Sequence, residues 1–500
     1  MSTLENNQAI DFKANDSFSP AKGAVRTKVI CHLGPKTKDP ESISELVESG
    51  MNVACLNFAQ GNSQQHLEIV QNLRMYLAAT KRMCAILVDT RGAKARTGKL
   101  KNSQPVTLKG GSTITIMPDL NFLGDETAFG VSYSNLSQVM APGRDILIDD
   151  GLVHLIVTDI KGKNVECTVV ADAVLGELKG VNLPGIRTDM PTLTAKDEHD
   201  LIFSCEQKVD IVAASFIRKA EDAKRVRQFL DMHGGSNIKM FSKIENQEGL
   251  ENFDEILSLS DGILVARGDL GIEIPTEKVT IAQKMMIAKC NIAGKPVVTA
   301  TQMLDSMINN PRPTRAETTD VANAVFDGSD CVMLSGETAQ GDFAPEAVRT
   351  MVSICREAER WIDYNFVHSS LRHFLRKRTL NVTETICSSS VKTSYDLGAS
   401  LILCLTETGN TAREICKYRP IAPVICVSAN EGTARQLLVH RGLFPLVVGS
   451  MLGTESLIAR SLAAATRSGL CKKGDLVVVI SGMREGVSGT TNVLRVLTVE

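Results

Sequence analysis

Short apolar runs, separated by longer stretches with helical spacing, recur along the chain between residues 27 and 336. The runs are rich in β-branched residues, which is typical of strands buried on both faces. Eight such runs occur, at residues 27–34, 51–58, 84–90, 210–216, 238–244, 262–266, 296–302 and 330–336. Buried strands that alternate with helices pair in parallel, so this α/β pattern predicts a closed (β/α)8 TIM barrel. An open doubly wound sheet is the alternative that the strand count alone leaves open.

Two other patterns predict further domains. The interval from residue 91 to residue 209 is too long for a single crossover between strands, and its first part alternates apolar and polar residues between Gly-rich turns. We therefore expect a small β-barrel domain inserted after the third strand. Beyond about residue 360 strands and helices alternate again, which predicts a C-terminal α/β domain with an open sheet.

The expected domain boundaries follow from these changes of pattern. The barrel, or A domain, takes residues 23–91 and 191–360, the inserted B domain takes residues 92–190, and the C domain takes residues 361–500. Residues 1–22 lack the apolar core of a signal peptide and contain acidic residues, so we expect them to form a loose N-terminal arm.

The composition favours a soluble enzyme that acts on small molecules. No apolar run approaches the roughly 18 residues of a membrane span, and the 55 basic residues nearly balance the 57 acidic ones. No basic stretch is interleaved with aromatics, which argues against a nucleic-acid partner. The 13 cysteines form no Cys-x-x-Cys pair and many lie in apolar strands, which indicates reduced thiols in a cytoplasmic protein.

Polar residues follow the predicted barrel strands at the end where a (β/α)8 enzyme carries its active site. Glu245 and Asp269 follow the fifth and sixth strands and offer the hard oxygen ligands that Mg²⁺ prefers. Lys243, two residues before Glu245, points to the same side of its strand and could stabilise negative charge on a transferring phosphoryl group or an enolate. An isolated cluster of this kind is more often a surface ion-pair cluster, but convergence on one barrel rim favours a site.

Long blocks of the sequence resemble the pyruvate kinase family. They include "SKIENQEG" (242–249), "SDGILVARGDLGIEIP" (260–275) and "GVNLPG" (180–185), and the resemblance runs from about residue 26 to residue 500. It implies a barrel with a mobile β lid and an effector-binding C domain, usually in a homotetramer. It also implies phosphoryl transfer from phosphoenolpyruvate to ADP, giving pyruvate and ATP in the last step of glycolysis. Neither a P-loop nor a Rossmann glycine motif is present, so the nucleotide would bind by another arrangement.

The resemblance also implies roles for individual residues. Its catalytic residues are Lys243, which stabilises the phosphoryl group in flight, Thr301 in the proton relay, and Arg96. The implied substrate-binding residues are Ala266, Arg267, Gly268 and Asp269 together with Thr301 and Lys243; the nucleotide-binding residues are Arg96, Lys196 and Asn57; and the ligands of Mg²⁺ or Mn²⁺ are Glu245 and Asp269.

The chain departs from the family in the stretch "ACLNFAQG" (54–61), where the family usually reads "ARxNFSHG". Cys55 stands in place of an arginine that meets the phosphates, Ala59 in place of a serine that ligates K⁺, and Gln60 in place of histidine. Losing one preorganised donor costs on the order of 3 kcal/mol of transition-state stabilisation. One interpretation is an active enzyme with a repositioned cation. The alternative is a catalytically weakened or inactive pyruvate kinase paralogue that acts as a regulatory subunit. A lyase on a related barrel explains neither the lid nor the C domain.

A second departure suggests how the cation site has changed. The remnant of the family's monovalent-cation site is Asn57, Asp89 and Thr90, and the following loop carries Lys94 where the family has glutamate. The ammonium of Lys94 could replace the ion, so we hypothesise that this enzyme does not require K⁺.

The C-terminal domain contains a candidate effector site in "LTETGNTAR" (405–413), where a strand leads into polar residues at the start of a helix. Such a start offers backbone N–H groups to a phosphate, although an ordinary helix cap is equally compatible with the residues alone. The resemblance favours a sugar-phosphate effector bound by Thr406, Thr408, Gly409, Asn410 and Thr411, with residues 485–491 as the facing loop.

Overall fold

The computed structural model describes residues 11–12, 16–17, 25–485, 487 and 489–500. At its centre is the predicted closed barrel, in the order β15-β16-β17-β18-β19-β3-β4-β5, so the open-sheet alternative is wrong. Each of the eight predicted runs holds one strand. The strands are β3 (Lys28–Leu33), β4 (Val53–Asn57), β5 (Ala85–Asp89), β15 (Ile211–Ala214), β16 (Lys239–Ile244), β17 (Gly262–Ala266), β18 (Val297–Ala300) and β19 (Cys331–Leu334).

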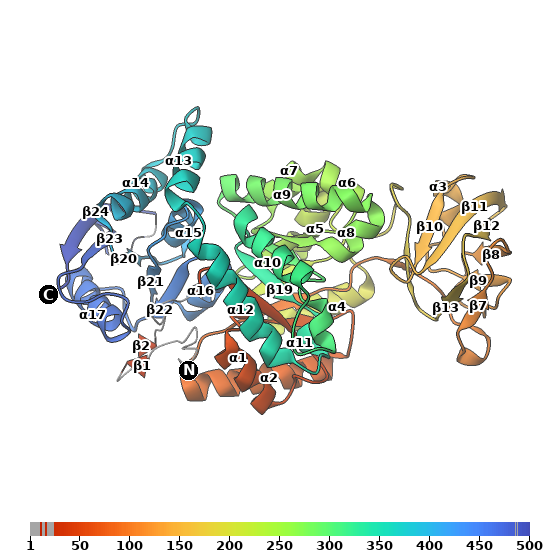
Figure 1. The fold of residues 1–500 in the computed structure, drawn as a ribbon, viewed down its shortest axis with the longest axis horizontal. Helices are drawn as coiled ribbons and strands as arrows, with labels where there is room; N and C mark the ends of the chain where they lie inside the picture. Colours follow the sequence, from red (N-terminus) through yellow and green to blue (C-terminus); the bar gives the residue numbers. More distant parts are fainter. Residues whose placement is uncertain (1–10, 13–15, 18–24, 486, 488) are drawn as a thin grey trace.

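Helices surround the barrel (Figure 1) and begin where the sequence supplies N-terminal caps. Thr194 and Thr314 each form a capping box with the acidic residue three positions later, Asp197 and Glu317. The barrel helices are α1 (Pro40–Ser49), α2 (Ser63–Thr80), α4 (Ala195–Glu206), α5 (Ala220–Met232), α6 (Gln247–Glu251), α7 (Phe253–Leu259), α8 (Arg267–Glu273), α9 (Thr276–Ala293), α10 (Arg315–Asp327), α11 (Gly336–Ala339) and α12 (Ala344–Arg360), with a 3₁₀ turn, η2 (Asp305–Ile308).

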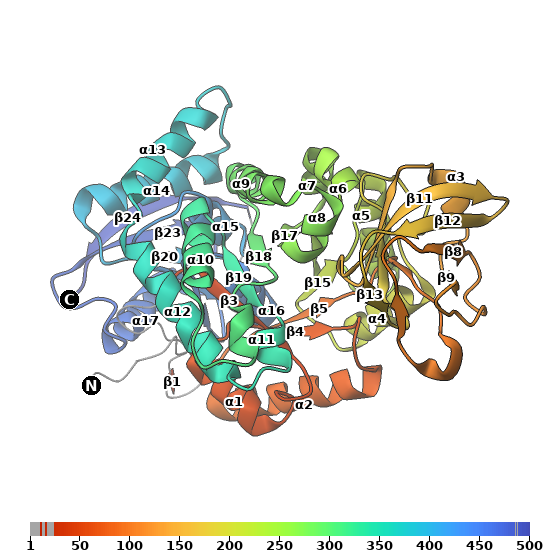
Figure 2. The same ribbon diagram turned by 45° about the vertical axis from the view of Figure 1, so that its right-hand side comes forward.

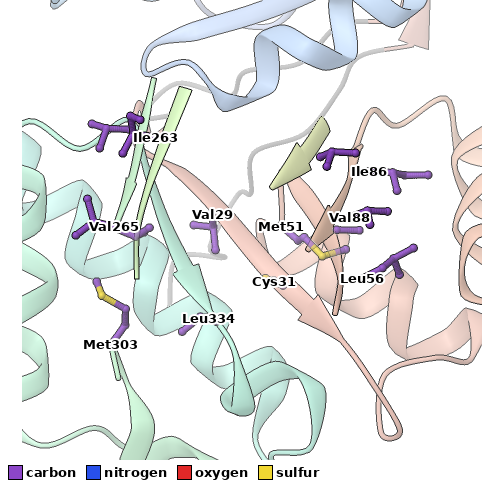
Figure 3. Close-up of a cluster of buried hydrophobic side chains, with 14 of the residues drawn as sticks. Val29, Cys31, Met51, Leu56, Ile86, Val88, Ile263, Val265, Met303 and Leu334 are labelled. Atoms are coloured by element: carbon purple, nitrogen blue, oxygen red, sulfur yellow. The ribbon is translucent and has the colours of Figure 1, made fainter. Parts of the chain in front are cut away.

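The barrel strands bury both faces, as their continuous apolar runs predict. Along β4, Val53 and Cys55 belong to the cluster inside the barrel, whereas Ala54 and Leu56 belong to the cluster between strands and helices. Figure 3 shows part of this outer cluster. The alternation means that polar residues at the last inward positions of the strands face one mouth of the barrel.

The predicted β domain is inserted between β5 and α4. Its main sheet has the order β6-β14-β10-β11-β12-β8-β9, and isolated bridges from Thr97 to Val131 and from Leu100 to Gly124 bring its two edges together. Figures 1 and 2 place it on the side of the barrel away from the C-terminal domain. Its elements are β6 (Ala95–Arg96), η1 (Lys101–Ser103), β7 (Val106–Leu108), β8 (Thr113–Met117), β9 (Ala128–Gly130), α3 (Leu136–Val139), β10 (Asp145–Ile148), β11 (Val153–Lys161), β12 (Asn164–Val169), β13 (Ala173–Leu175) and β14 (Gly180–Asn182).

The C-terminal domain is the predicted open α/β sheet, with the order β1-β2-β22-β21-β20-β23-β24. Its edge strands β1 (Asp11–Phe12) and β2 (Asp16–Ser17) come from the predicted N-terminal arm, most of which lies outside the described residues. The remaining elements are α13 (Tyr364–Leu375), α14 (Val382–Leu397), β20 (Leu401–Leu405), α15 (Asn410–Lys417), β21 (Val424–Ser428), α16 (Glu431–Gln436), η3 (Leu437–Val439), β22 (Leu443–Val447), α17 (Thr454–Arg467), β23 (Leu476–Gly482) and β24 (Thr491–Thr498).

The C-terminal domain contacts the barrel through apolar and charged groups. Leu438 and Val439 of the C domain join the cluster inside the barrel. Arg419 forms a buried ion pair with Asp330, which directly precedes β19 (Nη1 to Oδ1, 2.6 Å). Within the described part of the chain, no helix combines the length and apolar character needed to cross a membrane.

Candidate active site

A cavity of about 840 Å³ lies between the carboxyl ends of the barrel strands and the β lid. The lid contributes Asp149, Asp150, Leu178, Lys179 and Gly180 to its walls. The barrel contributes predicted site residues from five strands or the segments that directly follow them, namely Asn57, Asp89, Thr90, Lys243, Glu245, Asp269 and Thr301. Lys94, in the connection to the lid, and Arg96, in lid strand β6, also line the cavity. The structure therefore brings together residues that are far apart in the sequence.

Lys243 lies at the centre of the charged groups. Its Nζ donates to Asp89 Oδ1 (2.8 Å) and Ser215 Oγ (2.9 Å) and lies 3.2 Å from Glu245 Oε1. Burial by itself lowers the pKa of Lys243, but the charges of Asp89 and Glu245 outweigh it and the pKa is raised. Lys243 therefore stays protonated and presents a desolvated ammonium, which interacts strongly with a developing negative charge.

Glu245 and Asp269 provide the predicted pair of carboxylates. Burial raises the pKa of Glu245 to about 7, with Asp269 among the negative charges that add to the shift. Among the residues that the structure describes, no group of three or more His, Cys, Asp or Glu side chains could hold a metal ion. Two carboxylates nevertheless fit Mg²⁺, which typically takes one or two from the protein and its other oxygens from water and substrate phosphates.

Thr301 follows β18 with its backbone in the left-handed region (φ 70°), which is an outlier for a β-branched residue. Its Oγ1 accepts a hydrogen bond from the Gly268 N–H (2.9 Å), and its carbonyl accepts one from Arg267 Nη2 (2.7 Å). A Cβ at Gly268 would lie 3.3 Å from Thr301 Cγ2. The turn after β18 and the start of α8 therefore fit together closely, and strain of this kind is common at functional sites.

Three predicted site residues do not reach the cavity with their side chains. Lys196 pairs with Asp200 in its own helix (2.8 Å) and is not part of the cavity wall. The guanidinium of Arg267 pairs with Asp320 (2.7 Å) and with backbone carbonyls. Ala266 is buried at the end of β17. Arg267 thus holds the turn after β18 through its backbone carbonyls, whereas Lys196 and Ala266 are not part of the cavity wall.

Lys94 pairs with carboxylates outside the remnant of the monovalent-cation site in this structure. Its Nζ lies 2.6 Å from Asp269 Oδ1 and 4.0 Å from Asp150 Oδ1. The residues of that remnant bond instead to other parts of the chain. Asn57 Oδ1 accepts from the Ala59 N–H (2.9 Å), Asp89 Oδ1 from Lys243 (2.8 Å), and Thr90 Oγ1 from the Ser215 N–H (3.1 Å).

The sequence interpretation missed three contributors to this site. Ser215 links Lys243, Asp89 and the Thr90 carbonyl, and the Phe216 N–H donates to Glu245 Oε2. His32 lines the cavity at the end of β3. Ser215 and His32 stand at or just after strand ends, so a check of the first and fourth strands would have found both. The Phe216 contact needs a positive φ (54°) that the sequence does not indicate.

The candidate effector residues line a second cavity, of about 300 Å³, in the C-terminal domain. Thr406, Thr408, Asn410 and Thr411 face it, and Gly409 precedes α15 with φ 79°. The facing loop contributes Glu485, whose carboxylate accepts from the Gly453 and Thr454 N–H groups (3.2 and 2.7 Å).

The fold and the cavity define a class of protein. The barrel mouth holds a buried ammonium beside two carboxylates that suit a metal ion, and the inserted domain covers it. This arrangement is suited to an enzyme that transfers anionic groups. Comparison with known proteins identifies the family within this class. Two family models match, "Pyruvate kinase, barrel domain" over residues 24–348 and "Pyruvate kinase, alpha/beta domain" over residues 384–497.

Curated relatives match over nearly the whole chain. A pyruvate kinase of Dictyostelium discoideum is 47% identical and covers 100% of this chain and 98% of its own length. One of Clostridium acetobutylicum is 46% identical over 95% of this chain and 100% of its own. The crystal structure of a pyruvate kinase from Cryptosporidium parvum is 42% identical and superposes with a TM-score of 0.91, covering 95% of this chain and 96% of that one. The chain belongs to the pyruvate kinase family, and it is accordingly a phosphotransferase.

Proposed function

We propose that the chain transfers the phosphoryl group of phosphoenolpyruvate to ADP, giving pyruvate and ATP. The observation that carries the proposal is the buried ammonium of Lys243 beside Glu245 and Asp269 in one lidded cavity. Phosphoryl transfer depends on positioning and on neutralising charge, and this cavity supplies both. The extent of the similarity to curated enzymes favours activity over the alternative of an inactive regulatory subunit.

Each group of the cavity has a part in this reaction. The ammonium of Lys243 neutralises the phosphoryl group as it leaves the enol oxygen. Thr301 holds the Gly268 turn through its hydroxyl and supports the relay that protonates the enolate carbon. Arg96, on the lid side of the cavity, faces the phosphates, and closing the lid would exclude water. Glu245 and Asp269 would hold Mg²⁺ or Mn²⁺, which when bound polarises the phosphate oxygens.

The decisive experiment measures pyruvate formation from phosphoenolpyruvate and ADP with Mg²⁺, without any added pyruvate kinase. Robust turnover by the purified chain is expected. Absence of turnover, together with co-purification of an active homologue, would support the regulatory alternative instead.

The enzyme works without K⁺. Lys94 supplies a fixed positive charge to the cavity, Ala59 offers no hydroxyl, and Lys243 already occupies Asp89 Oδ1. At constant ionic strength the native rate is expected to be the same with and without K⁺. Lys94→Glu should be slower without K⁺ and should recover when K⁺ is added. Many-fold stimulation of the native chain by K⁺ would contradict the proposal.

The C-terminal cavity binds a sugar-phosphate effector through Thr406, Thr408, Gly409, Asn410 and Thr411. Its mixed polar lining and the two arginines at its edge, Arg413 and Arg484, suit a phosphate group. We expect a saturable rise in melting temperature with a sugar phosphate, and a smaller rise in Thr408→Val. If no sugar phosphate protects the chain, the site does not exist.

We also assign the chain to a cytoplasmic homotetramer, on the strength of relatives named cytosolic isozymes and the family's usual assembly.

A further inference from the structure

His32 is a buried imidazole at the mouth of the barrel that the proposed mechanism does not use. Its side chain lines the cavity although the residue is only 7% exposed. The Nε2 atom is buried and has no hydrogen-bond partner among the described residues. Burial lowers the pKa of His32 to about 4, and in either protonation state the ring carries at least one N–H donor.

The position of His32 depends on its neighbour Cys55. The register of β3 and β4 pairs the two residues directly, and the alternation of the strands points both into the barrel. Cys55 is fully buried and short, whereas the family's arginine at this position would extend toward the mouth. The small thiol therefore leaves room at the barrel mouth for the imidazole ring.

The group next to His32 is Asp89, a carboxylate that is 6% exposed. Its Oδ1 accepts hydrogen bonds from Lys243 Nζ (2.8 Å) and Ser215 Oγ (3.3 Å). In the described part of the chain no group donates a hydrogen bond to Oδ2, and His32 Nε2 lies 3.7 Å from it. Lys243 compensates the charge of Asp89 in this structure, and the second oxygen can still accept a hydrogen bond.

The ligands for a monovalent cation are weakened at this position. In the family a serine hydroxyl would ligate K⁺, but residue 59 is alanine and has no side-chain oxygen. The Asn57 amide oxygen and the Thr90 hydroxyl already accept hydrogen bonds from the backbone of the chain. One ligand is therefore missing, and the Asn57 and Thr90 oxygens are partly used by hydrogen bonds within the chain.

We propose that His32 is a positioning residue that takes over the contact of the monovalent cation with Asp89 by donating its Nε2–H to Asp89 Oδ2, while Lys94 supplies the positive charge of the cavity. The move needed is about 0.8 Å, from 3.7 Å to an ordinary hydrogen-bond distance of about 2.9 Å. When Lys243 turns from Asp89 toward the phosphoryl group, the imidazole keeps the carboxylate paired and in place. This inference rests on the proposed K⁺-independent reaction and adds His32 to Lys94 as a second group that supports it.

A matched pair of variants separates hydrogen bonding from packing. His32→Gln places an N–H donor at the reach of Nε2, whereas His32→Met has similar length and no donor. Without K⁺, His32→Met should lose kcat about tenfold or more, as expected for a lost bond to a charged group, with little change in KM. His32→Gln should stay close to the native rate. Added K⁺ should restore part of the activity of His32→Met only.

A measurement without turnover completes the test. Melting temperatures are compared in KCl and in tetramethylammonium chloride at equal ionic strength. A K⁺-specific rise in His32→Met, absent from the native chain and from His32→Gln, is expected. The proposal is overturned if His32→Met behaves as the native chain in both assays, or if both variants lose activity equally without a K⁺ response. An inactive native chain would overturn the proposed function, whereas the melting comparison would still decide the role of His32.

Discussion

At the scale of single residues, the polar groups at the barrel mouth are arranged around the buried positive charge of Lys243. Asp89, Ser215 and Glu245 surround its ammonium, so the side chain is oriented before any substrate arrives. Preorganised charge of this kind needs no rearrangement during the reaction, and it is usually the largest single contribution to catalysis.

Lys243→Met should therefore reduce kcat by a hundredfold or more, on the order of the loss of one preorganised donor. Lys239→Met is the matched control, because it removes a lysine from the other end of the same strand, where Lys239 lies 3.7 Å from Asp261. Steady-state kinetics of both variants check the prediction. Equal losses of kcat in the two variants would mean that Lys243 affects the rate only by stabilising the fold.

Cys55→Arg should destabilise the chain rather than improve it. Cys55 is fully buried and His32 is its strand neighbour, so a long cation would overpack the barrel, at a cost of about 1–3 kcal/mol. We expect a lower free energy of unfolding and no gain in kcat. A stable variant with higher kcat would show that the barrel mouth is empty beside the thiol.

At the scale of elements, the close approach of α8 to the turn after β18 shapes the floor of the cavity. Gly268 and Thr301 leave no room for a further methyl group without movement. The other glycine of α8, Gly271, has only an ordinary contact with Val279 (3.6 Å from an added Cβ). An added methyl group should therefore disturb α8 at Gly268 and be tolerated at Gly271.

Gly268→Ala should raise KM for phosphoenolpyruvate several-fold, because the new Cβ pushes Thr301 from its position. Gly271→Ala should keep native kinetics and gain up to about 1 kcal/mol of stability, because alanine favours a helix over glycine. Kinetics and thermal melting of the two variants check this. An unchanged KM in Gly268→Ala would mean that the turn adapts freely and does not position substrate.

At the scale of the whole molecule, the buried ion pair between Arg419 and Asp330 helps to join the C-terminal domain to the barrel. Asp330 accepts two bonds from Arg419, at 2.6 and 3.1 Å, and one from the Arg441 N–H. Burial would raise the pKa of Asp330, but Arg419 outweighs it and the pKa lies below its usual value of 3.8. The contribution of this pair to stability is therefore present above pH 3.8 and is lost as the pH falls through the lowered pKa.

Asp330→Asn should lower stability at neutral pH by about 3–5 kcal/mol, because it leaves the buried Arg419 without its carboxylate partner. Its stability should also fall less steeply in acid than that of the native chain. Glu357→Gln is the control, since its pair with Arg360 is largely exposed and contributes about 0–1 kcal/mol. Urea unfolding at neutral and acid pH measures both. Equal effects of the two changes would contradict the role of the pair.

The sequence by itself determined the barrel, the inserted lid and the C-terminal sheet. Strand and helix patterns depend on neighbours a few residues apart, and the rule that polar strand ends share one rim needs only the strand order. For that reason Lys243, Glu245 and Asp269 could be assigned to one rim from the sequence pattern. The family resemblance then supplied roles that pattern alone did not.

The tertiary structure decided which of these groups touch. Lys94 pairs with Asp269 across 175 positions, and Lys196 pairs with Asp200 instead of reaching the cavity. His32 lies 3.7 Å from Asp89 although β4 stands between their two strands. Such contacts depend on side-chain directions and burial contributed by several strands at once. The physical reason is that local sequence sets the elements, whereas charge pairing inside a barrel is settled only when all of its strands have closed.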